Sequence, residues 1–85
     1  MTYKRIILFS QDSCSSSKII REFLSFENIL FEEYNITKDY KARETMIKEY
    51  KSYTTPTVVV GEKVIRGFQL DLLEALLKEE NAPSH

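Results

Sequence analysis

The residues best suited to chemistry lie in the segment DSCSSS, residues 12–17, which holds the only cysteine of this 85-residue chain. Cys14 is followed directly by Ser15, Ser16 and Ser17, whose hydroxyls can donate hydrogen bonds to a thiolate. Ser17, one helical turn further on, is the best placed of the three. An apolar run precedes the segment and a helical pattern follows it. Cys14 is therefore expected where a strand ends and a helix begins.

That position favours a reactive thiol. A helix N-terminus has unpaired N–H groups and the positive end of a dipole, and both stabilise a negative sulfur. They can lower a thiol pKa from about 8.5 to roughly 3.5 to 7.5, which raises the thiolate fraction at neutral pH. Lys18 would add to the effect through its charge, and Asp12 would oppose it. The competing interpretations are a buried structural cysteine and a serine run that only caps the helix.

Composition argues against several functions. Twelve basic and thirteen acidic side chains give a net charge of -1, so there is no basic field to attract nucleic acid or a membrane surface. The only histidine, His85, ends the chain, which argues against a metal site or a catalytic triad built on histidine. The N-terminal apolar run is too short for a signal peptide or a membrane span, and one cysteine forms no internal disulfide. We therefore expect a cytoplasmic protein.

Hydrophobic patterning predicts the elements around Cys14. Residues 5–10 form a short segment around the continuous apolar run 6–9, which is typical of a strand buried on both faces. A helix capped by Asp12 or Ser13 then runs to about residue 28. Its apolar face comprises Ile19, Ile20, Phe23 and Leu24. Residues 29–36 predict a second, less buried strand. The apolar residues of that strand are Leu30, Tyr34 and Ile36.

The remainder predicts a helix, a hairpin and a last helix. Thr37 or Asp39 caps a charged helix that ends near residue 51. Its sheet-facing residues are expected to be Tyr40, Arg43, Ile47 and Tyr50, with Met46 beside them. Residues 57–66 predict a hairpin of two short strands, which Gly67 ends. Residues 69–80 predict a helix whose buried residues are Leu70, Leu73, Leu76 and Leu77.

The order of these elements is βαβαββα, without an internal repeat or a linker. It predicts an α/β fold with a four-stranded mixed sheet and helices on both faces. We expect a single domain over residues 1–85, with a core over about 3–80 and a flexible polar tail over 81–85.

Three segments in combination resemble the glutaredoxin branch of the thioredoxin-like superfamily: DSCSSS after the first strand, TTPTVVV before the hairpin and RGFQ after it. The resemblance spans about residues 3–77 and implies the thioredoxin-like (glutaredoxin) fold. The stretch GFQLD looks most like the small redoxins that serve ribonucleotide reductase. In the family a C-x-x-C or C-x-x-S motif opens the first helix. Its nucleophile maps onto Cys14, and its resolving cysteine maps onto Ser17.

The resemblance also implies where substrate binds. A proline with a cis peptide bond faces the cysteine in the family, and it maps onto Pro56. Thr55 before it would offer backbone groups to an extended substrate. Gly67 and Phe68 match the turn that follows the hairpin. The substrate-binding residues implied in this way are Ser15, Ser16, Thr55, Pro56, Gly67 and Phe68.

Several positions depart from the family's glutathione contacts. The basic residue before the family's motif falls at Gln11, the aromatic within the motif at Ser16, and the basic residue before the Thr-x-Pro element at Tyr53. Arg66 replaces the first of two paired glycines. Lys51 or Arg66 could supply positive charge to the carboxylates of glutathione instead.

The expected function is that of a monothiol thiol–disulfide oxidoreductase, monomeric and without a bound cofactor or metal. Its Cys14 thiolate would attack a disulfide or a glutathionylated thiol, and an external thiol would release the mixed disulfide. The expected partners are glutathione, as a co-substrate, or a protein disulfide or reductase. One alternative is a redoxin fold that has lost turnover and binds a partner protein. Another is a glutathione-assisted iron–sulfur carrier, although relatives of that kind carry a Cys-Gly-Phe-Ser motif that is absent here.

Overall fold

The computed structural model describes residues 5–81. Its elements are β1 (Ile6–Ser10), α1 (Ser15–Phe26), β2 (Glu32–Asn35), α2 (Tyr40–Lys48), β3 (Thr57–Val60), β4 (Lys63–Arg66) and α3 (Leu70–Asn81). The predicted order of elements is confirmed. Of the expected polar tail, Asn81 ends α3. The remainder of that tail, residues 82–85, lies outside the described residues.

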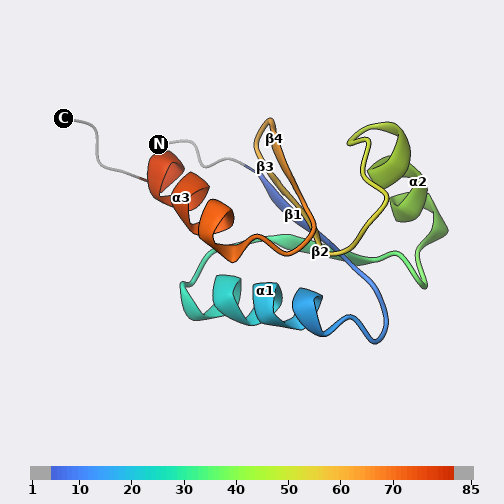
Figure 1. Ribbon diagram of the computed structural model, residues 1–85, viewed down its shortest axis with the longest axis horizontal. Coiled ribbons are helices and arrows are strands. Elements are labelled where there is room, and N and C mark those ends of the chain that lie inside the picture. Colours follow the sequence, from blue (N-terminus) through green and yellow to red (C-terminus); the bar gives the residue numbers. More distant parts are fainter. Residues whose placement is uncertain (1–4, 82–85) are drawn as a thin grey trace.

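The four strands form one mixed sheet in the order β2-β1-β3-β4. β1 pairs in parallel with β2 and antiparallel with β3, and β3 pairs antiparallel with β4. Helices α1 and α3 cover one face of the sheet, and α2 covers the other (Figure 1). The predicted mixed sheet with helices on both faces is confirmed.

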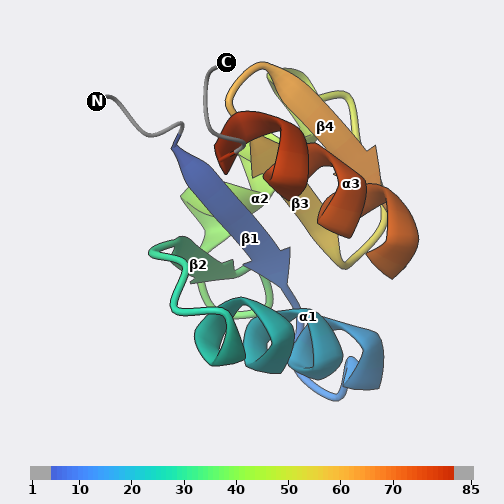
Figure 2. The ribbon, with the colours of Figure 1, turned by 90° about the vertical axis from the view of Figure 1, so that its left-hand side faces the viewer.

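Strand β1 is central to the core, and all five of its residues are buried, as predicted. Successive side chains of a strand point to opposite faces. Ile6 and Leu8 therefore pack on the side of α1 and α3, while Ile7 and Phe9 pack on the side of α2. Figure 2 shows β1 running between these two helical layers. The end of β1, where Cys14 follows, is held from both faces of the sheet.

The apolar face predicted for α1 is confirmed in part. Ile20 and Leu24 are fully buried, and Phe23 packs against the same cluster. Ile19, by contrast, is 45% exposed, because the buried face of the helix centres on residues 17, 20 and 24. The helix ends at Phe26, slightly before the predicted residue 28.

The predicted N-cap of α1 is wrong. Cys14 itself occupies the cap position, with extended backbone angles of φ -94° and ψ 98°. The Asp12 carboxylate accepts a hydrogen bond from Asn35 at 2.7 Å, and the Asp12 N–H donates to the Thr37 hydroxyl at 3.0 Å. Ser13 has a positive φ of 65°. Asp12 thus joins the loop before α1 to the end of β2 and does not cap the helix.

The second strand begins later than predicted, at Glu32. The chain leaves α1 through a turn in which Asn28 has a φ of 58° and the Ile29 N–H donates to the Leu24 carbonyl at 2.9 Å. Leu30 follows this turn outside the sheet and is 92% exposed. The prediction that Leu30 belongs to the strand is therefore wrong. The turn that ends α1 extends to residue 29, and the strand starts only at Glu32.

The predicted cap of α2 is confirmed, since Asp39 accepts from the Ala42 N–H at 3.0 Å. The face that α2 turns to the sheet differs from the predicted one. Ala42 and Met46 are buried, whereas Tyr40 and Arg43 are exposed. Tyr50 lies beyond the helix, and its ring packs at a tilt against Phe9, with ring centroids 5.8 Å apart. The helix therefore presents its small and flexible side chains to the sheet and leaves its larger polar ones outside.

The hairpin and the last helix match the sequence closely. β3 and β4 have the predicted bounds, with Val60 opposite Lys63 across the turn. Leu73, Leu76 and Leu77 of α3 are buried as predicted, and Leu70 is half-buried. Within residues 5–81, no helix has the length and apolar character needed to cross a membrane.

Candidate functional site

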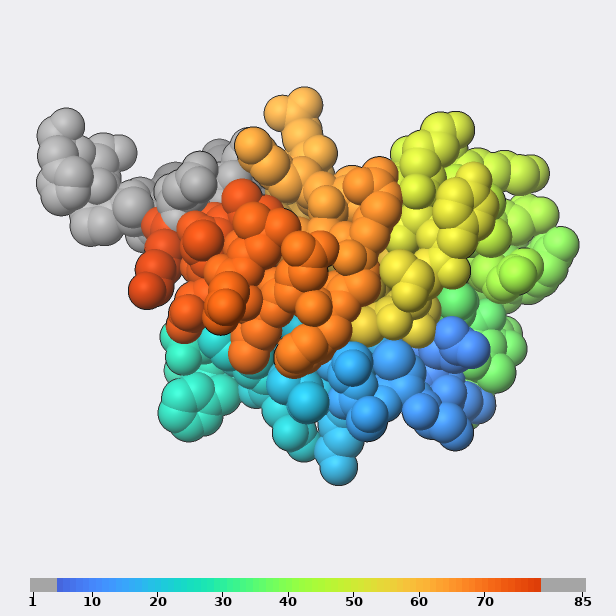
Figure 3. Space-filling view, viewed as in Figure 1, coloured from blue at the N-terminus to red at the C-terminus, as the bar shows by residue number. Residues whose placement is uncertain are grey.

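Cys14 lies where the start of α1 meets the segment ahead of β3, and Figure 3 shows these two segments in contact, in blue and yellow. Ser17 Oγ donates to Cys14 Sγ at 3.0 Å. Thr55 Oγ1 lies 3.6 Å from the same sulfur, although the two residues are 41 positions apart. Ser17 is fully buried and Cys14 is partly exposed. The sulfur is thus accessible and bordered by hydroxyl donors.

The surroundings of Cys14 favour its thiolate. Burial raises the pKa of the Cys14 thiol, but hydrogen bonds from the Ser17 and Thr55 hydroxyls lower it, and the nearby N–H groups of Ser17 and Ser16 lower it further. The net result is a pKa below the ordinary value. The helix N–H groups contribute as the sequence predicts, although neither forms a capping hydrogen bond. The larger contributions come from two hydroxyls.

The loop that carries Thr55 has the geometry that the resemblance implies. The Thr55–Pro56 peptide bond is cis, and Pro56 is buried. The Pro56 carbonyl accepts a hydrogen bond from the Gly67 N–H at 2.9 Å, which joins this loop to the turn after β4. Gly67 has a φ of 84°, a conformation that residues with a Cβ rarely adopt. Thr55, Pro56 and Gly67 therefore form one connected platform beside Cys14.

The other residues predicted for substrate binding have less direct contacts. Ser16 is half-buried and contributes its N–H group to the sulfur, whereas Ser15 is exposed. Phe68 follows the platform and is 45% exposed, and Tyr53 is 77% exposed. The two aromatic rings are free to meet a bound molecule.

Arg66 is held by the loop that leads to the platform. Its guanidinium donates to the Lys51 carbonyl at 3.0 Å and to the Tyr50 carbonyl at 2.7 Å. The buried hydroxyl of Ser52 in this loop lies 2.7 Å from that of Thr57, the first residue of β3. Arg66 thus fixes the path of the chain into Thr55, a role that the sequence did not indicate.

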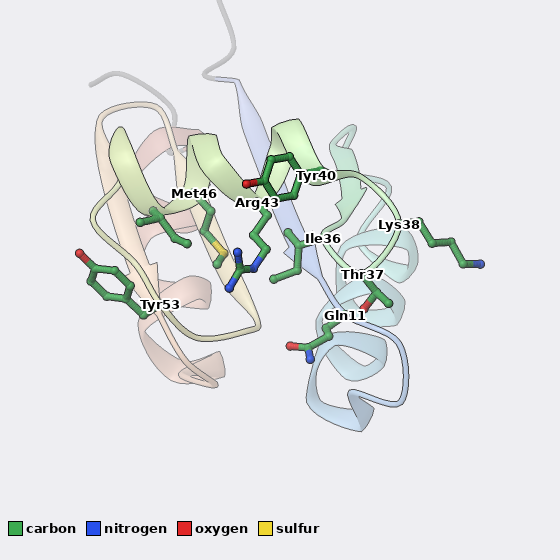
Figure 4. A pocket seen from close by; sticks show the side chains of 9 residues that line it. Gln11, Ile36, Thr37, Lys38, Tyr40, Arg43, Met46 and Tyr53 are labelled. Atoms are coloured by element: carbon green, nitrogen blue, oxygen red, sulfur yellow. The ribbon is translucent and has the colours of Figure 1, made fainter.

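A hollow of about 550 Å³ adjoins the site between α2 and the loops. It is lined by Gln11, Ile36, Thr37, Lys38, Tyr40, Arg43, Met46, Ile47 and Tyr53. Figure 4 shows the Arg43 guanidinium and the Gln11 amide directed into the hollow, while Lys38 extends away from it. Gln11 Oε1 accepts from Thr55 Oγ1 at 3.1 Å, so the hollow is connected to the residues around Cys14. The sequence missed Arg43 because its spacing placed it on the buried face of α2.

No cluster of three or more His, Cys, Asp or Glu side chains suited to a metal ion occurs in the described part of the chain. The reactive group of the site is the Cys14 thiol, which is partly exposed and is stabilised as an anion by uncharged hydrogen-bond donors. Such a group is a nucleophile toward disulfides.

Comparisons with known proteins agree with this geometry. The glutaredoxin family model matches residues 6–65, more than half of the chain. A glutaredoxin-like protein encoded in the rubredoxin operon of Clostridium pasteurianum is 28% identical over 74 residues, which cover 87% of this chain and 99% of the relative. A thioredoxin-like protein of known crystal structure is 39% identical, with a TM-score of 0.85 and coverage of 87% of this chain and 95% of that one.

The fold is also shared with a small redoxin. The glutaredoxin-like NrdH-redoxin of Escherichia coli superposes with a TM-score of 0.74 over 95% of this chain and 99% of its own, at 20% identity. The fold is thus the thioredoxin-like fold, as predicted. With the family model matched across β1 to β4 and the fold shared throughout, this chain belongs to the glutaredoxin family.

Proposed function

We propose that this protein is a thiol–disulfide oxidoreductase that works by a monothiol mechanism with Cys14 as its nucleophile. The observation that carries the proposal is the pair of hydroxyl donors, Ser17 and Thr55, on a partly exposed sulfur. The Cys14 thiolate attacks one sulfur of a disulfide, and the other sulfur leaves as a thiolate. An external thiol then attacks the resulting mixed disulfide, which releases Cys14 and leaves a new disulfide. Each cycle consumes one external thiol and releases one thiol of the substrate, so two cycles with two external thiols supply the two electrons that fully reduce a disulfide.

Ser17 supports the first step and cannot perform the second. Its hydroxyl donates to the sulfur, which stabilises Cys14 both as the attacking thiolate and as the leaving thiolate. A hydroxyl forms no disulfide, so an external thiol has to resolve the mixed disulfide. This requirement is the reason for proposing a monothiol cycle.

The platform beside Cys14 suits an extended substrate. The loop at Thr55 and the cis-Pro56 is fixed by the Gly67 hydrogen bond and by the Arg66 contacts to the preceding loop. Backbone groups that are held in this way can pair with an extended peptide and align its disulfide with the attacking sulfur. Glutathione is such a peptide, and we propose it as the co-substrate.

The hollow offers a place for a carboxylate of glutathione. Arg43 directs its guanidinium into it, and Gln11 adds an amide from the side of Cys14 (Figure 4). A guanidinium binds carboxylates with paired hydrogen bonds. At the positions of the family's two basic residues, this chain has Gln11 and Tyr53. Arg43 would supply the missing positive charge, and the Gln11 amide would supply a hydrogen bond.

The test is glutathione-dependent reduction of a small mixed disulfide. The wild-type protein should turn over, and Cys14→Ser should lose essentially all activity because no other thiol is present. Ser25→Ala is a control at an exposed serine further along the same helix, away from the site, and should retain activity. Activity that persists in Cys14→Ser would disprove the proposal. An inactive wild-type protein that forms stable complexes with a partner would favour a binding module instead.

The glutathione site has its own test. Arg43→Ala should raise the KM for glutathione about two- to fivefold and change kcat little, because an exposed ion pair contributes up to about 1 kcal/mol to binding. Lys38→Ala removes a charge that extends away from the hollow and serves as the control. Equal effects of the two substitutions would show that only net charge matters and that the hollow does not hold the carboxylate.

A further inference from the structure

The hydroxyl of Thr55 has two acceptors and one proton. Its Oγ1 lies 3.1 Å from Gln11 Oε1 and 3.6 Å from Cys14 Sγ. A hydroxyl donates a single hydrogen bond at a time. The amide oxygen accepts at any pH, whereas the sulfur becomes a strong acceptor only once it is a thiolate. Gln11 and the ionised Cys14 therefore require the same proton.

Gln11 is free to keep or give up its hydrogen bond from Thr55. Its backbone carbonyl accepts from the Cys14 N–H at 3.2 Å, which anchors the main chain beside the sulfur. Its side chain is exposed and extends from the end of β1 toward the hollow (Figure 4). Water can therefore replace Thr55 as the partner of the amide. The contact between Gln11 and Thr55 is not imposed by burial and can be exchanged during ionisation.

We propose that Gln11 is a positioning residue that restrains the reactivity of Cys14 by competing with its sulfur for the hydroxyl proton of Thr55. When the thiol ionises, Thr55 turns its O–H from Gln11 Oε1 to Cys14 Sγ, and water takes its place at the amide. The proposal rests on the proposed role of Cys14 as nucleophile. It adds a residue that sets how much thiolate is present before substrate arrives.

The donors that Gln11 does not influence remain in place. Ser17 Oγ and the N–H groups of Ser16 and Ser17 act on the sulfur from within α1. Removing the Gln11 amide therefore changes only the stabilisation that Thr55 gives to the Cys14 thiolate. Without the amide oxygen, the Thr55 hydroxyl is always available to the thiolate, so the pKa of Cys14 should fall.

Ionisable groups approach this contact from several elements. Asp12 and Lys18 flank Cys14 along the chain, and Asp12 is engaged by Asn35. Others line the hollow together with Gln11, namely Lys38, Tyr40, Arg43 and Tyr53. None of their side chains forms a hydrogen bond with the Cys14 sulfur, whose side-chain partners are Ser17 and Thr55. An uncharged replacement of Gln11 leaves all of these charges in place, so their effect cancels in a comparison with the wild type.

The test is a double-mutant cycle read by the pH dependence of Cys14 alkylation with iodoacetamide. The four proteins are the wild type, Gln11→Leu, Thr55→Val and the double variant. Gln11→Leu should lower the apparent pKa by about half a unit, and Thr55→Val should raise it by about half a unit or more. In the presence of Thr55→Val, Gln11→Leu should have no effect, because no shared proton remains.

A rise of the apparent pKa in Gln11→Leu would overturn the inference, because the amide would then be donating to Thr55 and assisting it. An equal fall with and without Thr55→Val would overturn it as well. Gln11→Glu provides a second measurement, since a carboxylate accepts and cannot donate. It should raise the apparent pKa, and by more when Thr55 is intact than beside Thr55→Val. The proposed function fails separately, if Cys14→Ser keeps its activity.

Discussion

At the scale of single residues, the reactivity of Cys14 depends on the hydrogen-bond donors around its sulfur. Ser17 lies three positions after Cys14 in the first turn of α1, where side chains point back toward the helix start. Its full burial removes competing water, so its hydroxyl has the sulfur as its hydrogen-bond partner. The serine at this position is therefore a donor to the thiolate, in addition to being a replacement for a second cysteine.

Ser17→Ala should raise the apparent pKa of Cys14 and slow its alkylation at neutral pH. Loss of one hydrogen bond to an ionised group corresponds to about one pKa unit and thus to a several-fold slower reaction. Because the wild-type pKa is depressed, the thiolate is lost as the pH falls through the folded-state pKa, and the variant should lose it at a higher pH. Ser15→Ala is the control, and similar shifts in both variants would contradict this role of Ser17.

At the scale of elements, α1 holds Cys14 in place through a narrow buried face. Ile20 and Leu24 pack under the helix against β1, β3 and α3. The opposite side of the helix reaches solvent, and Phe26 near its end is 82% exposed. A few buried contacts therefore position the helix, and they also fix the location of its first turn beside Cys14.

Leu24→Ala should lower the free energy of unfolding by about 2–5 kcal/mol, because it leaves a cavity beneath a fully buried side chain. Phe26→Ala removes a larger but exposed side chain and should change stability by no more than about 0.5 kcal/mol. Urea denaturation measures both values. A large loss in Phe26→Ala would indicate that this ring is covered in solution.

At the scale of the whole molecule, Glu33 joins three elements. Its carboxylate in β2 accepts from the Ser10 hydroxyl of β1 at 2.8 Å and from the Arg21 guanidinium of α1 through two contacts of 2.7 Å. The Arg21 hydrogen bond lowers the pKa of Glu33, burial raises it, and the Ser10 hydrogen bond lowers it further. The net direction is downward. This cluster ties the end of β1 to the helix that begins at the site.

The contribution of Glu33 to stability should depend on pH. A depressed carboxyl pKa stabilises the fold above the unfolded value of about 4.5, and this stabilisation is lost as the pH falls through the lower folded value. Glu33→Gln should therefore lose about 1–2 kcal/mol at pH 7 and show a weaker decline below pH 4.5 than the wild type. Urea denaturation at a series of pH values measures this.

The control for Glu33 is Glu32→Gln. The hydrogen bond from Arg5 lowers the pKa of Glu32 to about 2, yet that pair is exposed, with 63% and 43% of the two side-chain surfaces accessible. Solvent screening makes exposed pairs contribute little to stability. Equal losses in the two variants would show that the links of Glu33 between elements add nothing.

Local sequence determined the elements and the local part of the site. A buried strand followed by a polar turn and a helical pattern placed Cys14 at a helix start, and helical spacing alone brought Ser17 to its sulfur. The hairpin bounds followed from β-branched runs on either side of Gly61. These features depend on residues a few positions apart, so the sequence carries their signal directly.

Tertiary structure decided everything that joins distant residues. The sheet register brings Thr55 to Cys14, and the loop before α1 brings Gln11 to Thr55. It also decided which face of α2 is buried, which left Arg43 directed into the hollow. Residue spacing specifies which residues share a face but not what that face meets. Packing across the sheet determines what each face meets, and it added Thr55 as a second hydroxyl donor to the one that helical spacing supplies.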